Sequence, residues 1–190
     1  MIPEIDKSSF RDSSGFMFYH EGICHRQINP VYKVCYDYFL ESRLYKKFLN
    51  EKLLIPYETV SSSHLPFSRG YLDIRSEPIA LISYPYEWCF TQFKKAALAT
   101  LDILKHALDN NMILKGANTY NIQFNNGQPL LIDILSFKKY KEGETWVGYK
   151  KFCENFLGPL TLISYKNIRL GRMLREYIEG IPLNSLSHRK

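Results

Sequence analysis

The sequence lacks the spacings and runs that mark several common classes of protein. Its four cysteines lie far apart and include no Cys-x-x-Cys pair, so neither a zinc site nor a disulfide framework is indicated. No apolar run approaches the ~20 residues that cross a bilayer, and the polar first 15 residues do not resemble a signal peptide. None of the five histidines has another His or Cys at metal-ligand spacing. We therefore expect a cytoplasmic protein without a membrane partner.

Aromatic side chains, in contrast, are abundant. Of the 190 residues, 14 are Tyr and 12 are Phe, and hydrophobic residues make up 45% of the chain against 23% for charged ones. This composition is typical of a folded chain with a large core and not of a disordered one. The net charge of +6 permits an anionic ligand such as a nucleotide. The basic residues are scattered, however, and nucleic acid is not an expected partner.

The first half of the chain predicts strands around one helix. Residues 10–28 have the pattern of a β-hairpin with its turn at Gly22. Residues 31–50 follow an Asn-Pro start signal and carry apolar side chains at helical spacing, with a break near Ser42. Residues 53–60 and 71–76 resemble further strands, and a buried strand is expected from residue 79.

The second half predicts helices around one hairpin. A long helix is expected after Thr91, which can cap it, with an apolar stripe formed by Phe93, Ala97, Leu101, Leu104 and Leu108. A further helix is expected over residues 146–165, and a last helical piece near residue 170. Strands in the front and helices behind indicate an α+β fold.

The stretch LKGANTYNIQFNNGQPLLIDILSF carries the residues most suited to chemistry. Asp133 interrupts its apolar second strand, and Asn121 precedes the NNGQ turn. A buried carboxylate needs a partner. Mg²⁺ prefers oxygen ligands, so Asn121 and Asp133 are the candidate metal ligands. The alternative is that Asp133 only accepts backbone hydrogen bonds and that Asn121 only ends a loop.

The order of the predicted elements is that of protein-kinase-like folds. In those folds a catalytic loop ends in Asn, and the hairpin that follows presents an Asp to Mg²⁺. We therefore expect a two-lobed domain of the protein-kinase-like, aminoglycoside-phosphotransferase-like kind. Residues 1–84 would form a β-rich front lobe with one helix, and residues 85–190 a minimal helical back lobe. The expected cofactors are ATP and Mg²⁺.

Candidate nucleotide-binding residues follow from this order. The turn before the first long strand could cover phosphates with its backbone amides, and Arg26 could meet them with Glu41 as its ion-pair partner. Lys33 is the rival of Arg26, and a purely structural Arg26–Glu41 pair is the alternative to a clamp. The aromatic segment at residues 84–88 could line the pocket or belong to the core. The candidates are Ser13, Ser14, Gly15, Arg26, Glu41, Tyr84 and Glu87. Lys115 is expected to be a solvated loop lysine, unless it faces the cleft.

Several strings resemble one bacterial family, described as SAM-dependent methyltransferase-like proteins and related to a nodulation protein. They are DSSGFMF, HRQI, LISYPYEW, ANTYNIQF, PLLIDILSF and EGIPL, and the resemblance covers residues 9–183. It implies an N-terminal kinase-like region that accompanies a class I methyltransferase domain.

Two departures from the family pattern limit the activity that it implies. No Gly-x-Gly turn for a methyltransferase cofactor occurs, so the methyltransferase domain is absent from this chain. The family pattern has Asp where this sequence has Gly116, five residues before Asn121, at the position of the catalytic base. No catalytic residue is therefore assigned.

The sequence thus predicts a catalytically impaired nucleotide- and Mg²⁺-binding module that accompanies a methyltransferase domain or protein partner. Two alternatives remain open. One is an active Mg-ATP-dependent phosphotransferase acting on a small molecule or protein. The other is a part of a SAM-dependent methyltransferase whose catalytic domain lies outside this chain. Whether the native protein continues beyond residue 190 is also left open.

Overall fold

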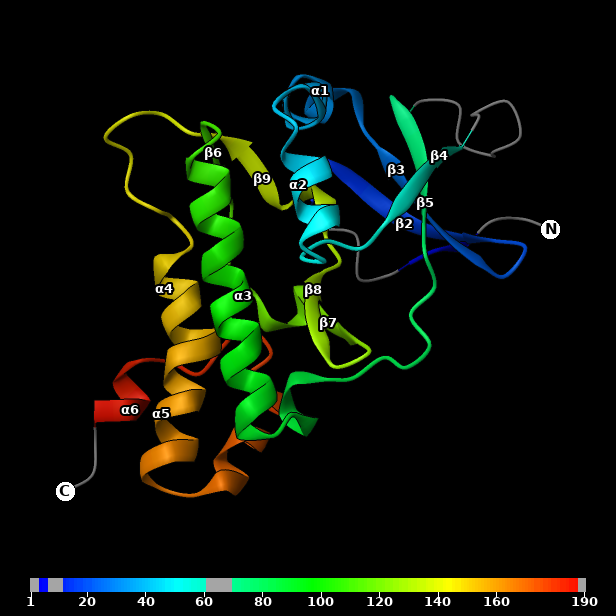
Figure 1. The fold of residues 1–190 in the computed structure, drawn as a ribbon. Helices are drawn as coiled ribbons and strands as arrows, with labels where there is room; N and C mark the ends of the chain where they lie inside the picture. The colour runs from blue at the N-terminus through cyan, green and yellow to red at the C-terminus, as the bar shows by residue number, and fades with distance from the viewer. Residues whose placement is uncertain (1–3, 7–11, 61–69, 188–190) are drawn as a thin grey trace.

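The computed structural model describes residues 4–6, 12–60 and 70–187 (Figure 1). Strands dominate the front half of the chain and helices the back half, as Figure 1 shows from blue to red. This is the α+β class that the sequence predicts. In the described residues, no helix is long and apolar enough to cross a membrane.

Five antiparallel strands form the main sheet, in the order β1-β2-β3-β5-β4. Their bounds are Glu4–Ile5 for β1, Gly15–His20 for β2, Ile23–Ile28 for β3, Tyr57–Val60 for β4 and Leu72–Ser76 for β5. Strands β2 and β3 confirm the predicted hairpin. Its turn residues, Glu21 and Gly22, both have positive φ, 51° and 78°, which suits the twist of a two-residue hairpin turn.

Two short helices replace the single helix predicted for residues 31–50. After the 3-10 helix η2 (Pro30–Tyr32) come α1 (Lys33–Glu41) and α2 (Leu44–Asn50). The helical conformation is interrupted at Arg43, whose φ of 62° is left-handed and incompatible with a continuing helix. This agrees with the break expected near Ser42.

The buried strand expected from residue 79 is wrong. Residues 79–84 join none of the described sheets, and Leu81 and Ile82 are 76% and 52% exposed. The reason lies in the strand order, because β5 already has β3 on one edge and β4 on the other. A strand directly after β5 therefore has no adjacent edge to pair with. The polar connection predicted between residues 61 and 70 lies almost wholly outside the described residues.

The long helix α3 (Phe90–Leu108) follows the 3-10 helix η4 (Pro85–Glu87). Its N-cap is Cys89 and not Thr91, and the Cys89 backbone N–H donates to Gln92 Oε1 at 3.0 Å. Of the predicted stripe, Leu101 and Leu108 are exposed. The buried face combines the large Phe93 and Ile103 with five small side chains, Ala96, Ala97, Ala99, Thr100 and Ala107.

Two strand pairs follow α3. Strand β6 (Met112–Leu114) pairs with β9 (Phe137–Lys139), and β7 (Ile122–Asn125) pairs with β8 (Gln128–Leu131). The 3-10 helices η5 (Thr119–Asn121) and η6 (Ile134–Ser136) connect them. A backbone hydrogen bond of 2.8 Å from Leu131 N to Leu53 O joins this region to the front half.

The remaining helices are α4 (Tyr149–Phe152), the π-helix η7 (Cys153–Leu157), α5 (Gly158–Tyr165), the 3-10 helix η8 (Ile168–Arg175) and α6 (Asn184–Ser187). Among them, η7 and α5 pack against α3, and η8 packs against α5 and η4 (Figure 1). The wide turn at η7 lies just before Pro159, whose ring clashes with the carbonyl four residues back in a regular α-helix.

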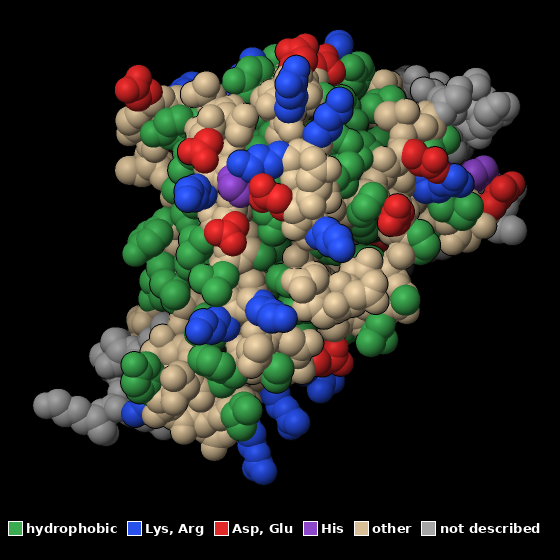
Figure 2. Space-filling model, viewed as in Figure 1, with side chains coloured by type: hydrophobic (Ala, Val, Ile, Leu, Met, Phe, Trp, Pro, Cys, Tyr) green, Lys and Arg blue, Asp and Glu red, His purple; other side chains and the backbone are tan. Residues whose placement is uncertain are grey.

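One aromatic core joins the two halves. Phe137 of β9 stacks on Phe39 of α1 with ring centroids 5.0 Å apart, and its centroid lies 5.6 Å from that of Phe48 in α2. All three side chains are fully buried. The front and back halves therefore hold the site residues in fixed relation. On the face shown in Figure 2, Lys and Arg are interspersed with Asp and Glu over the upper part of the molecule.

Candidate functional site

A groove of about 790 Å³ lies between the main sheet and the segment that follows β8. Its lining is mostly apolar and includes Met17 of β2, Cys24 of β3, Ile79 and Ile82, with Ile132 on the opposite side. The volume falls within the range of small-molecule sites, and apolar lining with a few polar groups is typical of them. His25 and Arg26 of β3 also line the groove, and Arg26 brings a permanent positive charge to it.

Asp133 lies at the edge of this groove, directly after Ile132. It is not inside a strand, as the sequence suggested, but two residues after β8, where it caps η6. Its Oδ1 accepts from Leu135 N at 3.2 Å and forms an ion pair with Arg26, and its Oδ2 accepts from Ser136 Oγ at 2.7 Å. The carboxylate is thus satisfied by local donors and by one long-range cation, Arg26.

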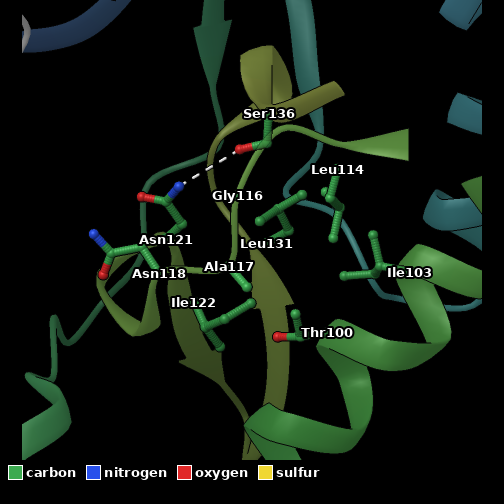
Figure 3. Close-up of a pocket in the computed structure, with 10 residues that line it drawn as sticks. All are labelled: Thr100, Ile103, Leu114, Gly116, Ala117, Asn118, Asn121, Ile122, Leu131 and Ser136. Carbon is green, nitrogen blue, oxygen red and sulfur yellow. Dashed lines mark hydrogen bonds between the residues drawn. The ribbon is translucent and has the colours of Figure 1, made fainter. Parts of the chain in front are cut away.

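Asn121, the second predicted metal ligand, lies beside Asp133. It ends η5, and its Nδ2 is 3.5 Å from Asp133 Oδ2 and 3.5 Å from Ser136 Oγ. Figure 3 shows the Asn121 side chain directed toward Ser136. Both distances are at the outer limit of hydrogen bonding, so Asn121 is held loosely enough to offer its amide oxygen instead.

The oxygen donors of Asn121 and Asp133 fit a Mg²⁺ ion that keeps other ligands. Among the described residues there is no cluster of three or more His, Cys, Asp or Glu that could hold a metal by itself. Mg²⁺ is commonly held by one or two protein oxygens together with phosphate oxygens and water. The pair therefore suits a metal that arrives with a phosphate ligand.

The partner expected for Arg26 is wrong. Arg26 pairs with Asp133, whereas Glu41 is exposed at the last residue of α1. Phe39 lies on the buried side of α1, and Glu41, two residues later, therefore points to the opposite, exposed side. The rival Lys33 is exposed and pairs with Asp37 four residues on, with Nζ and Oδ2 2.6 Å apart. Arg26 is therefore the basic residue that meets Asp133, while Arg75, which also lines the groove, pairs with Glu58.

The predicted turn before β2 is present, and its amides are already engaged. Ser14 N donates to Asp12 Oδ1 at 2.8 Å, and Gly15 N approaches Asp12 O at 3.4 Å. The backbone N–H of Asn29 donates to Ser14 O at 2.8 Å and its side chain to Ser13 O at 2.9 Å. Of the three candidates, Ser14 and Gly15 are buried and Ser13 is exposed.

Lys115 is not the solvated loop residue that we expected. Its Nζ donates to Ser14 Oγ at 3.1 Å, lies 3.3 Å from Asp12 Oδ2 and stands 5.2 Å from the centre of the Tyr32 ring. Burial alone would raise the pKa of Asp12, but hydrogen bonds from Ser14 and the charge of Lys115 hold that pKa below its usual value. Sequence reasoning considered Lys115 and the turn that begins at Asp12, but it missed the contact between these two residues. They are 103 positions apart, and no local pattern links them.

Gly116, the position of the missing carboxylate, borders a small cavity (Figure 3). The cavity measures about 10 Å³, which is room for at most one water molecule. In Figure 3, Asn121 and Asn118 lie on one side of it, and Thr100 and Ile103 of α3 on the other. A Cβ added at Gly116 meets no atom within 4 Å, so packing does not require glycine here.

Tyr84 and Glu87, the two candidates in the crossover segment, do not line the groove. Tyr84 is 44% exposed and stacks on Tyr86 with ring centroids 5.4 Å apart. Glu87 Oε2 accepts from Tyr84 N at 2.8 Å and so caps η4. The groove takes Pro78, Ile79 and Ile82 from this connection instead.

Comparison with known proteins gives one informative relationship. No family model matches the chain. The chain is similar to the nodulation protein NoeA of Rhizobium meliloti (strain 1021), with 34% identity over 176 residues. The match takes in 92% of this chain and 37% of NoeA, so the chain spans little more than a third of the length of that relative.

Proposed function

Starting from this relationship to NoeA, we propose that the chain is a kinase-like module that binds a nucleotide together with Mg²⁺ and is catalytically impaired. The order of elements supports the proposal. A β2–β3 hairpin leads into α1, two more strands complete the sheet, and the long α3 leads to the pairs β6–β9 and β7–β8. Kinase-like domains carry their basic residue on the third strand, their Asn in the loop after the long helix and their Asp after a hairpin.

The observation that carries the proposal is the convergence of Arg26, Asn121 and Asp133. They come from β3, from the end of η5 and from the residue that caps η6, and Arg26 and Asp133 are 107 positions apart. Their side chains nevertheless meet at the edge of the groove of about 790 Å³. A hydrophobic core alone would not require a cation, a carboxylate and an amide to gather at one point.

Each group has a distinct role in the proposed complex. The apolar groove takes the nucleotide base, and Arg26 at its edge takes the phosphates as a fixed, always-charged donor. Asp133 and Asn121 hold Mg²⁺, which neutralises phosphate charge when it is bound. To bind Mg²⁺, Asp133 must release Arg26, and Arg26 is then free to bind the phosphates. The nucleotide and Mg²⁺ are therefore expected to bind together.

Gly116 is the basis for proposing impaired catalysis. A kinase-like site needs a side chain at this position to orient and deprotonate the attacking hydroxyl, and glycine has none. The alternative, an active phosphotransferase, requires another group to take this role.

The relationship to NoeA supports a second proposal, which concerns context. Since the matched region is 37% of that nodulation protein, we propose that the module acts beside a further domain or protein. We also propose that it acts in the cytoplasm, in a process related to that of NoeA. The family resemblance names a SAM-dependent methyltransferase as that companion. Methyl transfer is not proposed for this chain alone, because the sequence has no Gly-x-Gly turn for the cofactor.

Calorimetric titration with ATP, with and without Mg²⁺, tests the nucleotide proposal. The wild-type chain should bind ATP more tightly with Mg²⁺, and Asp133→Asn should lose the Mg²⁺ dependence while keeping the size of the side chain. Glu144→Gln removes a carboxylate that pairs with Lys138, outside the site, and serves as the charge-matched control. Absence of ATP binding by the wild-type chain would overturn the proposal.

A further inference from the structure

Two cations, Arg26 and Lys115, lie beside the Asp133 segment, in a region that we call the mouth of the proposed site. Each cation is paired with a carboxylate of the same chain. Arg26 pairs with Asp133, and Lys115 pairs with Asp12. The two pairs belong to one region. The Lys115 backbone N–H donates to Ser136 O at 2.7 Å, and Ser136 also donates to Asp133. An anionic ligand that binds here therefore competes with a carboxylate for either cation.

The turn that carries Asp12 packs directly against the Asp133 segment. A Cβ added at Gly15 would lie 2.8 Å from Leu135 Cδ1 and 2.2 Å from Gln27 O. Only glycine permits this approach. The contact fixes the turn beside η6 and brings the Asp12 carboxylate to Lys115 across a sequence separation of 103.

Asp12 occupies the donors that a phosphate group would use. Its two oxygens accept from the Ser14 backbone N–H at 2.8 Å and from Lys115 Nζ at 3.3 Å. A backbone amide at a turn together with a lysine is a usual way to bind phosphate oxygens. The carboxylate thus stands where an external anion would find its best partners.

We infer that Asp12 is a built-in competitor of the phosphates for Lys115, and that Lys115 with the turn at residues 12–15 is the subsite for the terminal phosphates. This inference rests on the proposed function for the identity of the ligand, but the anion subsite can be tested without it. Through its contacts with Ser14 N and Lys115, Asp12 stabilises the module in its ligand-free state. A nucleotide with a long phosphate chain displaces it, whereas adenosine does not reach it.

The test measures binding of tripolyphosphate, without Mg²⁺, by calorimetry at low salt. Asp12→Asn keeps an oxygen that can accept from Ser14 N and removes only the charge. Since partly exposed ion pairs contribute modestly, this variant should bind tripolyphosphate about fivefold more tightly than the wild-type chain. Glu144→Gln loses the same charge elsewhere and should change the affinity less than about twofold, because salt screens distant charges.

The double variant separates competition from general repulsion. In a Lys115→Met background, Asp12→Asn should no longer tighten binding, because the cation in dispute is gone. The inference is overturned if Asp12→Asn binds like Glu144→Gln, if its gain persists without Lys115, or if no variant binds tripolyphosphate.

Titration of the same proteins with Mg-ATP distinguishes this inference from the proposed function. If Mg-ATP binds the wild-type chain but Asp12→Asn has no effect, the competitor role fails and the nucleotide proposal stands. If tripolyphosphate responds as expected and Mg-ATP binds no variant, the anion subsite stands and the nucleotide proposal fails.

Discussion

Replacing Asp133 with alanine should destabilise the fold more than replacing Arg26 with methionine. The two residues form one ion pair, yet their other contacts differ. Asp133 also accepts hydrogen bonds from Leu135 N and Ser136 Oγ, whereas Asp133 is the sole described ion-pair partner of Arg26. Loss of Arg26 leaves a carboxylate that still accepts two hydrogen bonds, but loss of Asp133 leaves a guanidinium without a charged acceptor in the part of the chain that the structure describes.

The expected cost follows from how far the pair is buried. Breaking a fully buried pair costs about 3–5 kcal/mol, and an exposed pair contributes less than about 1 kcal/mol. The side chains of Arg26 and Asp133 are 17% and 20% exposed, which places the pair between these limits. We therefore expect about 2 kcal/mol for Asp133→Ala and about 1 kcal/mol for Arg26→Met.

Thermal and urea unfolding of the two variants measure this difference. For a chain of this size, 1 kcal/mol shifts Tm by about 2–4 °C, so Tm should fall by about 4–8 °C for Asp133→Ala and about 2–4 °C for Arg26→Met. The double variant should cost little more than Asp133→Ala, because the pair is lost only once. An equal or larger loss for Arg26→Met would refute the view that Arg26 is retained for ligand binding.

Three further predictions concern other positions. Gly15→Ala should cost about 2 kcal/mol in urea unfolding, because its Cβ would lie 2.2 Å from Gln27 O; wild-type stability in this variant would contradict the geometry. Gly116→Asp should leave Tm within about 2 °C of the wild type and raise slow Mg-ATP turnover at least about tenfold over Gly116→Asn, and equal rates would argue against a base position there. Burial lowers the pKa of His25, so the unfolded chain binds more protons as the pH falls through about 6.5, and the free energy of unfolding should decline there. His25→Gln should flatten that decline, and an unchanged slope between pH 7 and pH 5 would exclude His25 as its source.

Local sequence patterns correctly predicted those elements whose structure depends mainly on neighbouring residues. The β2–β3 hairpin follows from alternating side chains around Gly22, and the helix break follows from the polar residues near Ser42. The face of α3 was misjudged because the large Leu101 and Leu108 were expected to point inward. Small side chains such as Ala96 and Thr100 form the contact instead, since they let β6, β8 and α5 approach the helix closely.

The candidate site was predictable only in part, because some of its contacts depend on tertiary packing and not on local sequence. Asn121 and Asp133 share one short hairpin region, so their proximity follows from sequence. The partners of Arg26 and Lys115 lie more than 100 positions away, and only the packing of the front half on the back half determines them. Glu41 was a plausible partner by order of elements, but the direction of a side chain at a helix end depends on where that helix stops.

Electron paramagnetic resonance with Mn²⁺ in place of Mg²⁺ tests the central claim most directly. Mn²⁺ accepts the same oxygen ligands as Mg²⁺, and the decrease in the signal of the free ion measures how much of it is bound. We expect ATP to add about one bound Mn²⁺ per chain in the wild type and in Glu144→Gln, and none in Asp133→Asn. If Asp133→Asn held Mn²⁺ with ATP as tightly as the wild type, or if the wild type held none, the nucleotide- and metal-binding account would be contradicted.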